Sequence, residues 1–132
     1  MTDLTRSRRL ARERALQLAY EAQMKSRDVG EILAALPVEP DPYTVTLVNA
    51  MGEHRERADE LIARHARGWD LERLAVIDRL VMTLAISELL SDDPPPVAVV
   101  LDEAVALAKE FSTEDSGSFV NGVLSACVTD LH

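Results

Sequence analysis

Residues 71–90 constrain the fold more than any other segment, because a helix formed there would carry apolar side chains on nearly all sides. The main polar interruptions are Asp78, Arg79, Thr83, Ser87 and Glu88. A helix that is apolar nearly all round is buried among other elements. The three consecutive prolines at positions 94–96 prevent it from continuing. We therefore predict a central helix over residues 71–90 with the rest of the chain packed around it.

The rest of the chain also favours helix. It has 5 glycines among 132 residues and long runs of the strong helix formers Ala, Leu, Glu and Arg. Periodicity and cap residues predict helices over residues 6–25, 28–36, 41–66, 97–111 and 112–130. No segment carries a clear strand pattern. A chain of this length suits one domain, so the expected architecture is an all-α, compact single-domain bundle of six or seven helices over residues 1–132.

Composition and motifs argue against several classes of protein. No apolar stretch approaches the roughly 20 residues that span a bilayer, and no hydrophobic region follows the first arginines, so we expect a soluble cytoplasmic protein. The single cysteine, Cys127, lies on an apolar stripe and is expected to be structural. His54 and His65 would share a helix face about 16 Å apart, too far to ligate one metal. Phosphate-binding loops, nucleophile elbows and metal-protease motifs do not occur, so we expect neither catalysis nor a cofactor.

Charge is distributed unevenly along the chain, whose net charge is -9. Residues 1–27 carry seven basic and three acidic side chains, whereas the remainder carries seven basic and twenty acidic ones. Cations in the first turns of a helix are mildly unfavourable, by about 0.3–1 kcal/mol each. Local stability therefore does not explain the cluster, and contact with a polyanion would. The alternative is pairing with the acidic remainder of the same chain. The clustered arginines are Arg6, Arg8, Arg9, Arg12 and Arg14.

Residues 109–124 join the last two predicted helices. Ser112 and Asp115 have the spacing of a capping box, which starts a helix by accepting from its free N–H groups. Phe119 lies about 100° away from Val120 on a helix, and so off the apolar stripe that Val120 begins. A large aromatic side chain that leaves the stripe is a candidate contact surface. Single-stranded RNA commonly stacks its bases on such side chains, with about 1–3 kcal/mol per base.

Other residues allow two interpretations each. Tyr20 is either a residue at the rim of the core or a platform for base stacking. Asp78 and Arg79 either form an ion pair with each other or emerge where the central helix reaches a partner. Trp69, just before a cap residue, is predicted to cover the core.

These segments together resemble the NusB family of transcription antitermination factors, over most of the chain and in the same order. The resemblance is weak between residues 28 and 64 and most specific in the closing segment. The residues that carry it are Arg8-Arg9, residues 11–13 and 15–20, Trp69-Asp70-Leu71, Ile77-Asp78-Arg79, Glu88-Leu89, Asp102-Glu103-Ala104, Phe111, Glu114-Asp115-Ser116 and residues 119–124.

The resemblance implies an all-helical, non-catalytic RNA-binding adapter. Family members bind the boxA element of nascent RNA, with affinity raised by NusE, a small-subunit ribosomal protein. With other Nus factors they support antiterminated transcription by RNA polymerase, especially of ribosomal RNA. The alternative is a helical protein–protein interaction module, or a homodimer, without specific RNA binding.

The resemblance also implies roles for particular residues. Asp78, with Glu72 nearby, would face NusE. Basic side chains that can occur in relatives are replaced here by Leu10, Gly117 and Ser118, so the first helix would supply most of the phosphate contacts. The residues that would contact RNA phosphates are Arg8, Arg9 and Arg12, and those that would lie on or near the RNA surface are Tyr20, Arg79, Asp115, Ser116 and Phe119.

Overall fold

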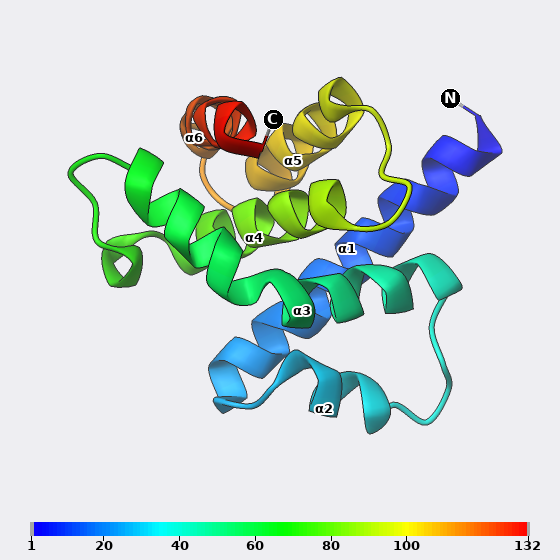
Figure 1. Ribbon diagram of the computed structural model, residues 1–132. Coiled ribbons are helices and arrows are strands. Elements are labelled where there is room, and N and C mark those ends of the chain that lie inside the picture. Colours follow the sequence, from blue (N-terminus) through cyan, green and yellow to red (C-terminus); the bar gives the residue numbers. More distant parts are fainter. Residues whose placement is uncertain (1, 132) are drawn as a thin grey trace.

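Helix α4 (Val76–Leu90) lies at the centre of the molecule, as its apolar sequence predicts. In the computed structural model, which describes residues 2–131, every side chain from position 81 to position 88 is buried. Helices α1 (Asp3–Lys25), α3 (Pro42–His65), α5 (Val97–Phe111) and α6 (Ser116–Leu131) all contact α4. Figure 1 shows α5 and α6 on one side of α4 and α3 on the other, with α1 passing behind them. The predicted all-α bundle is confirmed.

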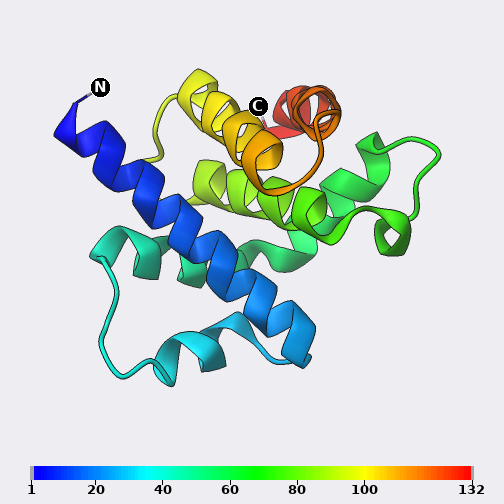
Figure 2. The same ribbon diagram turned by 180° about the vertical axis from the view of Figure 1, so that it is seen from behind.

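The short helix that follows α1 closes the lower end of the bundle. The short helix α2 (Val29–Ala34) packs against α1 and α3. Figure 2 shows α1 running diagonally across the back of the molecule, with α2 below it. Asp41 starts α3 as predicted, because its carboxylate accepts a hydrogen bond from the Tyr43 N–H at 2.8 Å and Pro42 follows in the first turn.

The predicted continuous helix over residues 71–90 is wrong at its beginning. A 3-10 turn, η1 (Leu71–Arg73), is separated from α4 by Leu74 and Ala75, whose backbones are extended with ψ of 145° and 133°. The extended backbone leaves the Leu74 side chain buried in the core. It also places Asp78 in the first turn of α4, where the helix dipole favours an anion.

The junction between α5 and α6 also differs from the prediction, because α6 begins at Ser116 and not near Ser112. The Ser116 hydroxyl accepts from the Thr113 N–H at 3.2 Å and donates to the Ser112 hydroxyl at 3.1 Å. Gly117 follows in a crowded position, where a Cβ atom would come within 2.7 Å of Lys109 Cε. The predicted capping box of Ser112 and Asp115 is therefore replaced by a hydroxyl cluster.

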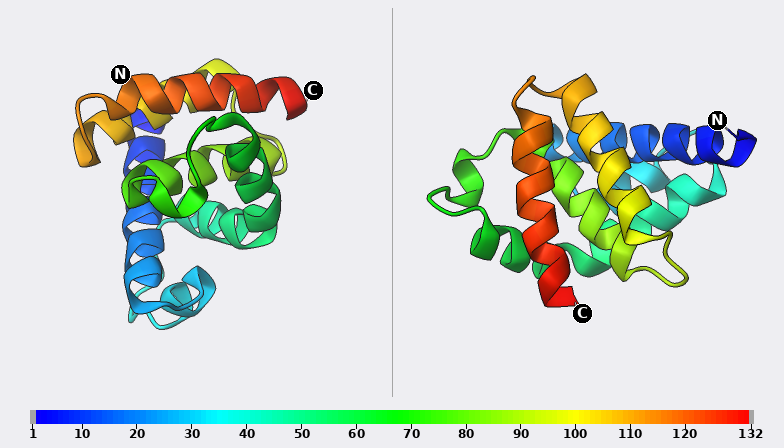
Figure 3. Two further views of the ribbon diagram at one scale, coloured as in Figure 1. Left: turned by 90° about the vertical axis from the view of Figure 1, so that its left-hand side faces the viewer. Right: turned by 90° about the horizontal axis from the view of Figure 1, so that it is seen from above.

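The C-terminal ends of α3 and α6 are joined by an ionic cluster. The Asp130 carboxylate accepts from the Arg64 guanidinium at 2.9 Å and lies 2.7 Å from His65 Nε2. Figure 3 shows α6 crossing the second half of α3 there. The hydrogen bonds to His65 and Arg64 hold the pKa of Asp130 below its usual range, and the bond to His65 has the larger effect. Cys127, one turn earlier, is fully buried, and burial raises the pKa of its thiol to about 11.

The Asp130 cluster predicts a pH-dependent contribution to stability. The pKa of the Asp130 carboxyl group is lower in the folded than in the unfolded chain. The cluster therefore stabilises the fold fully when the pH is above the carboxyl pKa of the unfolded chain, about 3.9, and this stabilisation is lost as the pH falls through the lower pKa of the folded chain. We expect Asp130→Asn to be less stable than the unmodified chain at pH 7, and the difference to vanish in strong acid. Thermal melts from pH 7 to pH 2 test this, and a difference that persists in acid would contradict it.

Within residues 2–131, no helix is both long enough and apolar enough to cross a membrane.

Candidate nucleic-acid interface

Arg12 does not face solvent, which corrects its predicted role as a phosphate contact. Its side chain is 4% exposed, and its Nε and Nη2 atoms donate to the two carboxylate oxygens of Glu88 at 2.8 and 2.7 Å. The Tyr43 hydroxyl donates to the same carboxylate. Burial, with the hydrogen bond to Glu88, raises the pKa of Tyr43 to about 12. Arg12 thus joins α1 to α4 inside the molecule.

The other arginines of α1 have different surroundings. Arg9 donates to both carboxylate oxygens of Glu103 on α5, at 2.9 and 3.0 Å, although its own side chain stays partly exposed. Arg8 lies over the ring of Tyr43, with Cζ 4.0 Å from the ring centroid. Arg14 is exposed and has no carboxylate partner among residues 2–131. Arg6 lies 3.8 Å from the Asp3 carboxylate on the exposed first turn. Among residues 2–131, pairing with acidic side chains therefore accounts for Arg6, Arg9 and Arg12, and leaves Arg8 and Arg14 without a carboxylate.

A surface groove lies beside the first turn of α4, between η1 and the start of α6. We call it the α4–α6 groove. It brings together four residues of the predicted interface, Asp78, Asp115, Ser116 and Phe119, of which the family resemblance places Asp78 toward NusE and the other three toward RNA. The predicted RNA and NusE surfaces therefore meet here. The groove is lined by Trp69, Arg73, Leu74, Ala75, Asp78, Thr113, Asp115, Ser116 and Phe119.

The aromatic wall of the groove consists of Phe119 and Trp69. Their ring centroids are 6.4 Å apart and their planes meet at 69°, an edge-to-face contact. Phe119 is partly buried against the core, whereas Trp69 is 52% exposed and does not cover the core as predicted. Trp69 is a groove residue that sequence reasoning missed, because only the fold brings it next to Phe119.

The polar residues in and beside the groove differ in whether they have hydrogen-bond or ion-pair partners. The Asp78 side chain is 8% exposed, and its Oδ1 atom is enclosed without a hydrogen-bond partner among the described residues. Arg79 turns away from it and pairs with Asp59 at 3.3 Å, so the predicted ion pair between Asp78 and Arg79 is wrong. Ser116 is 2% exposed and its hydroxyl belongs to the junction cluster, so it shapes the wall and offers no free hydroxyl.

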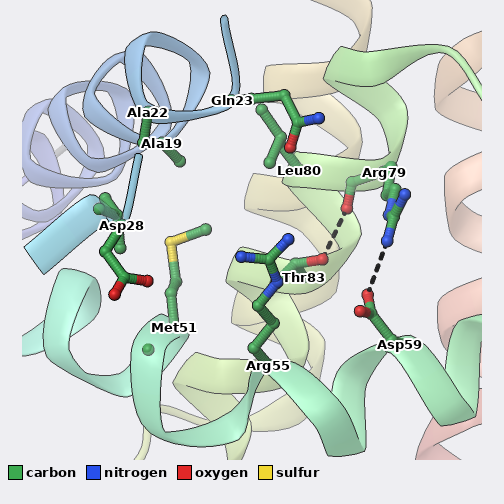
Figure 4. Close-up of a pocket in the computed structure, with 12 residues that line it drawn as sticks. Ala19, Ala22, Gln23, Asp28, Met51, Arg55, Asp59, Arg79, Leu80 and Thr83 are labelled. Carbon is green, nitrogen blue, oxygen red and sulfur yellow. Dashed lines mark hydrogen bonds and ion pairs between the residues drawn. The ribbon is translucent and has the colours of Figure 1, made fainter. Parts of the chain in front are cut away.

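The other predicted residues lie around the same turn of α4 but outside the groove. Tyr20, 41% exposed, lines a neighbouring apolar hollow with Leu16, Gln17, Ile77 and Phe111. Arg79 lines a third hollow between α1, α3 and α4, where Figure 4 shows its ion pair with Asp59. Glu72 is exposed on η1 and is not among the residues that line these hollows.

Three consecutive residues, Ile77, Asp78 and Arg79, therefore each face a different hollow around the start of α4. The third hollow also contains Arg55 of α3, which sequence reasoning missed and which has no carboxylate partner among residues 2–131. Within the same range, no group of three or more His, Cys, Asp or Glu side chains is arranged to hold a metal ion.

The chain is thus an all-α bundle with an arginine-rich first helix and an aromatic groove at the start of its central helix. Residues 9–129 match the NusB family model, and the chain belongs to the NusB family.

Relatives and solved structures agree with this assignment. A protein of Saccharopolyspora erythraea named transcription antitermination protein NusB is 47% identical over 125 residues, covering 89% of this chain and 84% of its own. A protein of the same name from Beutenbergia cavernae is 46% identical, covering 89% and 86%. The structure of NusB from T. maritima superposes with a TM-score of 0.82 at 31% identity, covering 93% of this chain and 91% of that one. A structure of the antitermination factors NusB and NusE in complex with double-stranded RNA superposes with a TM-score of 0.76 at 27% identity, covering 95% and 98%.

Proposed function

We propose that this protein is a transcription antitermination factor that acts as a non-catalytic adapter in the cytoplasm. With NusE it binds single-stranded boxA RNA of nascent transcripts, especially those of ribosomal RNA, and supports antitermination by RNA polymerase together with other Nus factors. The observation that carries the proposal is the α4–α6 groove, which joins an aromatic wall to the Asp78 carboxylate, whose Oδ1 atom has no hydrogen-bond partner among residues 2–131, in a chain of the NusB family.

The RNA-binding part of the proposal rests on two kinds of contact. Arg8 and Arg14 retain guanidinium groups that no carboxylate of residues 2–131 neutralises, so they can pair with phosphates. Phe119 and Trp69 offer ring surfaces at the groove, and Tyr20 offers another in the neighbouring hollow. Bases of a single strand stack on such rings without regard to pairing. The α1 arginines would thus hold the RNA backbone while the aromatic side chains hold bases.

The NusE-binding part of the proposal rests on Asp78. Asp78 lines the α4–α6 groove and is 8% exposed there, while its Oδ1 atom is enclosed, so a donor from a partner protein would reach the carboxylate from the groove. A hydrogen bond to a charged group contributes about 1.5–3 kcal/mol. We propose that Asp78 accepts from NusE and that the exposed Glu72 lies at the edge of the same contact.

We therefore expect Asp78→Asn to weaken binding of NusE by roughly 10- to 150-fold, the factor that corresponds to loss of about 1.5–3 kcal/mol. Calorimetric titration with NusE in the absence of RNA measures this change. The unfolding free energy should fall by no more than about 1 kcal/mol, because only the interaction with the helix dipole is lost. Asp102→Asn, on the exposed face of α5, is the matched control and should bind NusE as the unmodified chain does. Equal affinity of the Asp78 and Asp102 variants would refute this assignment.

The whole function is tested by size-exclusion chromatography of this protein with NusE and labelled RNA. We expect boxA RNA to co-elute with both proteins in one peak, and a scrambled RNA of the same length and composition to elute separately. Equal co-elution of the two RNAs would contradict specific recognition.

One observation favours the alternative of a protein-interaction module or homodimer without specific RNA binding. Arg6, Arg9 and Arg12 already pair with Asp3, Glu103 and Glu88 of the same chain, so three of the five clustered arginines have an internal counter-charge. In that case, replacing Arg8 with alanine would leave RNA retention unchanged. Light scattering on the same chromatography column measures the mass of the free protein and decides between a monomer and a homodimer.

A further inference from the structure

Arg8 is held differently from Arg9 and Arg12 of the same helix. Arg9 and Arg12 each donate two hydrogen bonds to a carboxylate, whereas the Arg8 guanidinium lies over an aromatic ring. Its Cζ atom is 4.0 Å from the centroid of the Tyr43 ring, while that of Arg12 is 5.8 Å away. Tyr43 therefore orders Arg8 without supplying a negative charge.

This difference matters for an anionic partner. A carboxylate neutralises a guanidinium and occupies its N–H donors, whereas a ring attracts the cation through its quadrupole and leaves the edge donors free. Arg8 is also only partly exposed, since the ring covers one face of it. Arg8 thus has a defined position but, among residues 2–131, neither a carboxylate partner nor a hydrogen-bond acceptor for its guanidinium, and this arrangement suits a phosphate contact.

Tyr43 can serve as a platform because it is itself fixed. It is the second residue of α3, and its N–H donates to the Asp41 carboxylate that caps the helix. At the other end of the side chain, its hydroxyl donates to the Glu88 carboxylate of α4, which also binds Arg12. Burial and the hydrogen bond to Glu88 raise the pKa of Tyr43 to about 12, so the hydroxyl remains a donor at neutral pH. The ring is therefore anchored to three helices at once.

We propose that Tyr43 is a positioning residue for RNA binding, which presents the Arg8 guanidinium to a phosphate group of the bound strand. The proposal rests on the proposed function, because it needs an RNA ligand. It adds a residue that lies outside the groove and that no sequence motif marks.

The test is a double-mutant cycle on the affinity for boxA RNA in the presence of NusE, measured by fluorescence anisotropy. We expect Tyr43→Leu, which removes the ring, to weaken binding by about two- to five-fold, the usual range for a partly exposed cation–π contact. Arg8→Ala should weaken binding further and reduce the slope of log affinity against log salt by about 0.7, the value for one phosphate contact on a single strand. Adding Tyr43→Leu to Arg8→Ala should then change nothing more.

Tyr43→Phe separates positioning from stability. It keeps the ring under Arg8 but removes the donor to Glu88, so we expect RNA affinity within about two-fold of the unmodified chain together with a lower unfolding free energy. Equal losses of RNA affinity for the Phe and Leu variants would overturn the proposal, as would an effect of Tyr43→Leu that persists in the Arg8→Ala background. If the unmodified chain with NusE binds no RNA, the proposed function fails as well. Normal RNA binding with a non-coupled Tyr43 refutes the positioning role alone.

Discussion

Replacing Glu88 with alanine is expected to lower the free energy of unfolding by about 3–5 kcal/mol, because it strands the Arg12 guanidinium inside the molecule without a counter-charge. The same change removes the acceptor of the Tyr43 hydroxyl, so this group and the two donating nitrogens of Arg12 all lose their partner. Urea denaturation at pH 7, followed by circular dichroism, measures the change. A shift of this size removes a large part of the stability of a small domain.

The matched control for Glu88→Ala is Glu21→Ala. Glu21 pairs with Lys25 at 3.1 Å on the exposed side of α1, where both side chains are solvated. Exposed pairs of this kind contribute about 0–1 kcal/mol, so the control should be nearly as stable as the unmodified chain. Replacing Arg12 and Glu88 together by Met and Leu should restore much of the loss, since no unpaired charge then remains. A cost for Glu88→Ala as small as that of the control would show that the pair is not enclosed as described.

Replacing Phe119 with alanine is expected to weaken binding of boxA RNA, with NusE present, by roughly 5- to 150-fold, which corresponds to about 1–3 kcal/mol for one stacked base. The expectation follows from the position of the ring at the groove, with its edge-to-face contact to Trp69. Fluorescence anisotropy of labelled RNA measures the affinity of each variant.

Two further variants separate stacking from packing at this position. Phe119→Leu keeps apolar bulk against the core but has no ring, so we expect it to fold and still lose most of the affinity. Val38→Ala changes an exposed apolar side chain in the connection between α2 and α3, and should bind RNA normally. If Phe119→Leu binds boxA RNA as tightly as the unmodified chain, the ring does not stack on a base.

The helices could be predicted from the sequence because periodicity and caps are local signals. The apolar segment at residues 71–90 correctly indicates a central helix, and Asp41 with Pro42 correctly marks the start of α3. The same segment hides the break at Leu74 and Ala75, because residues 74–77 are all apolar and show no change of pattern where α4 begins. At the α5–α6 junction, several hydroxyl-bearing residues could each act as a cap, and the sequence does not show that the Ser116 hydroxyl bonds to both Thr113 and Ser112.

The candidate site could be predicted only in part, because its contacts depend on residues far apart in the chain. The arginines of α1 look equivalent in sequence, yet Arg12 meets Glu88 across 76 positions and Arg9 meets Glu103 across 94. No local pattern distinguishes those two from Arg8. In the same way, nothing near Trp69 in the sequence indicates that it lies against Phe119. The residue types therefore indicate which contacts are chemically possible, whereas the tertiary structure determines which side chains remain available for a partner.

The adapter function is tested most directly by titrating labelled boxA RNA with this protein, with and without NusE, at two salt concentrations. We predict that NusE lowers the dissociation constant for boxA RNA but not for a scrambled RNA. We also predict that log affinity falls with log salt by about 0.7 for each phosphate contacted. Equal affinity for the two RNAs in the presence of NusE, or affinity that does not change with salt, would contradict a boxA-specific adapter that grips the RNA backbone through α1.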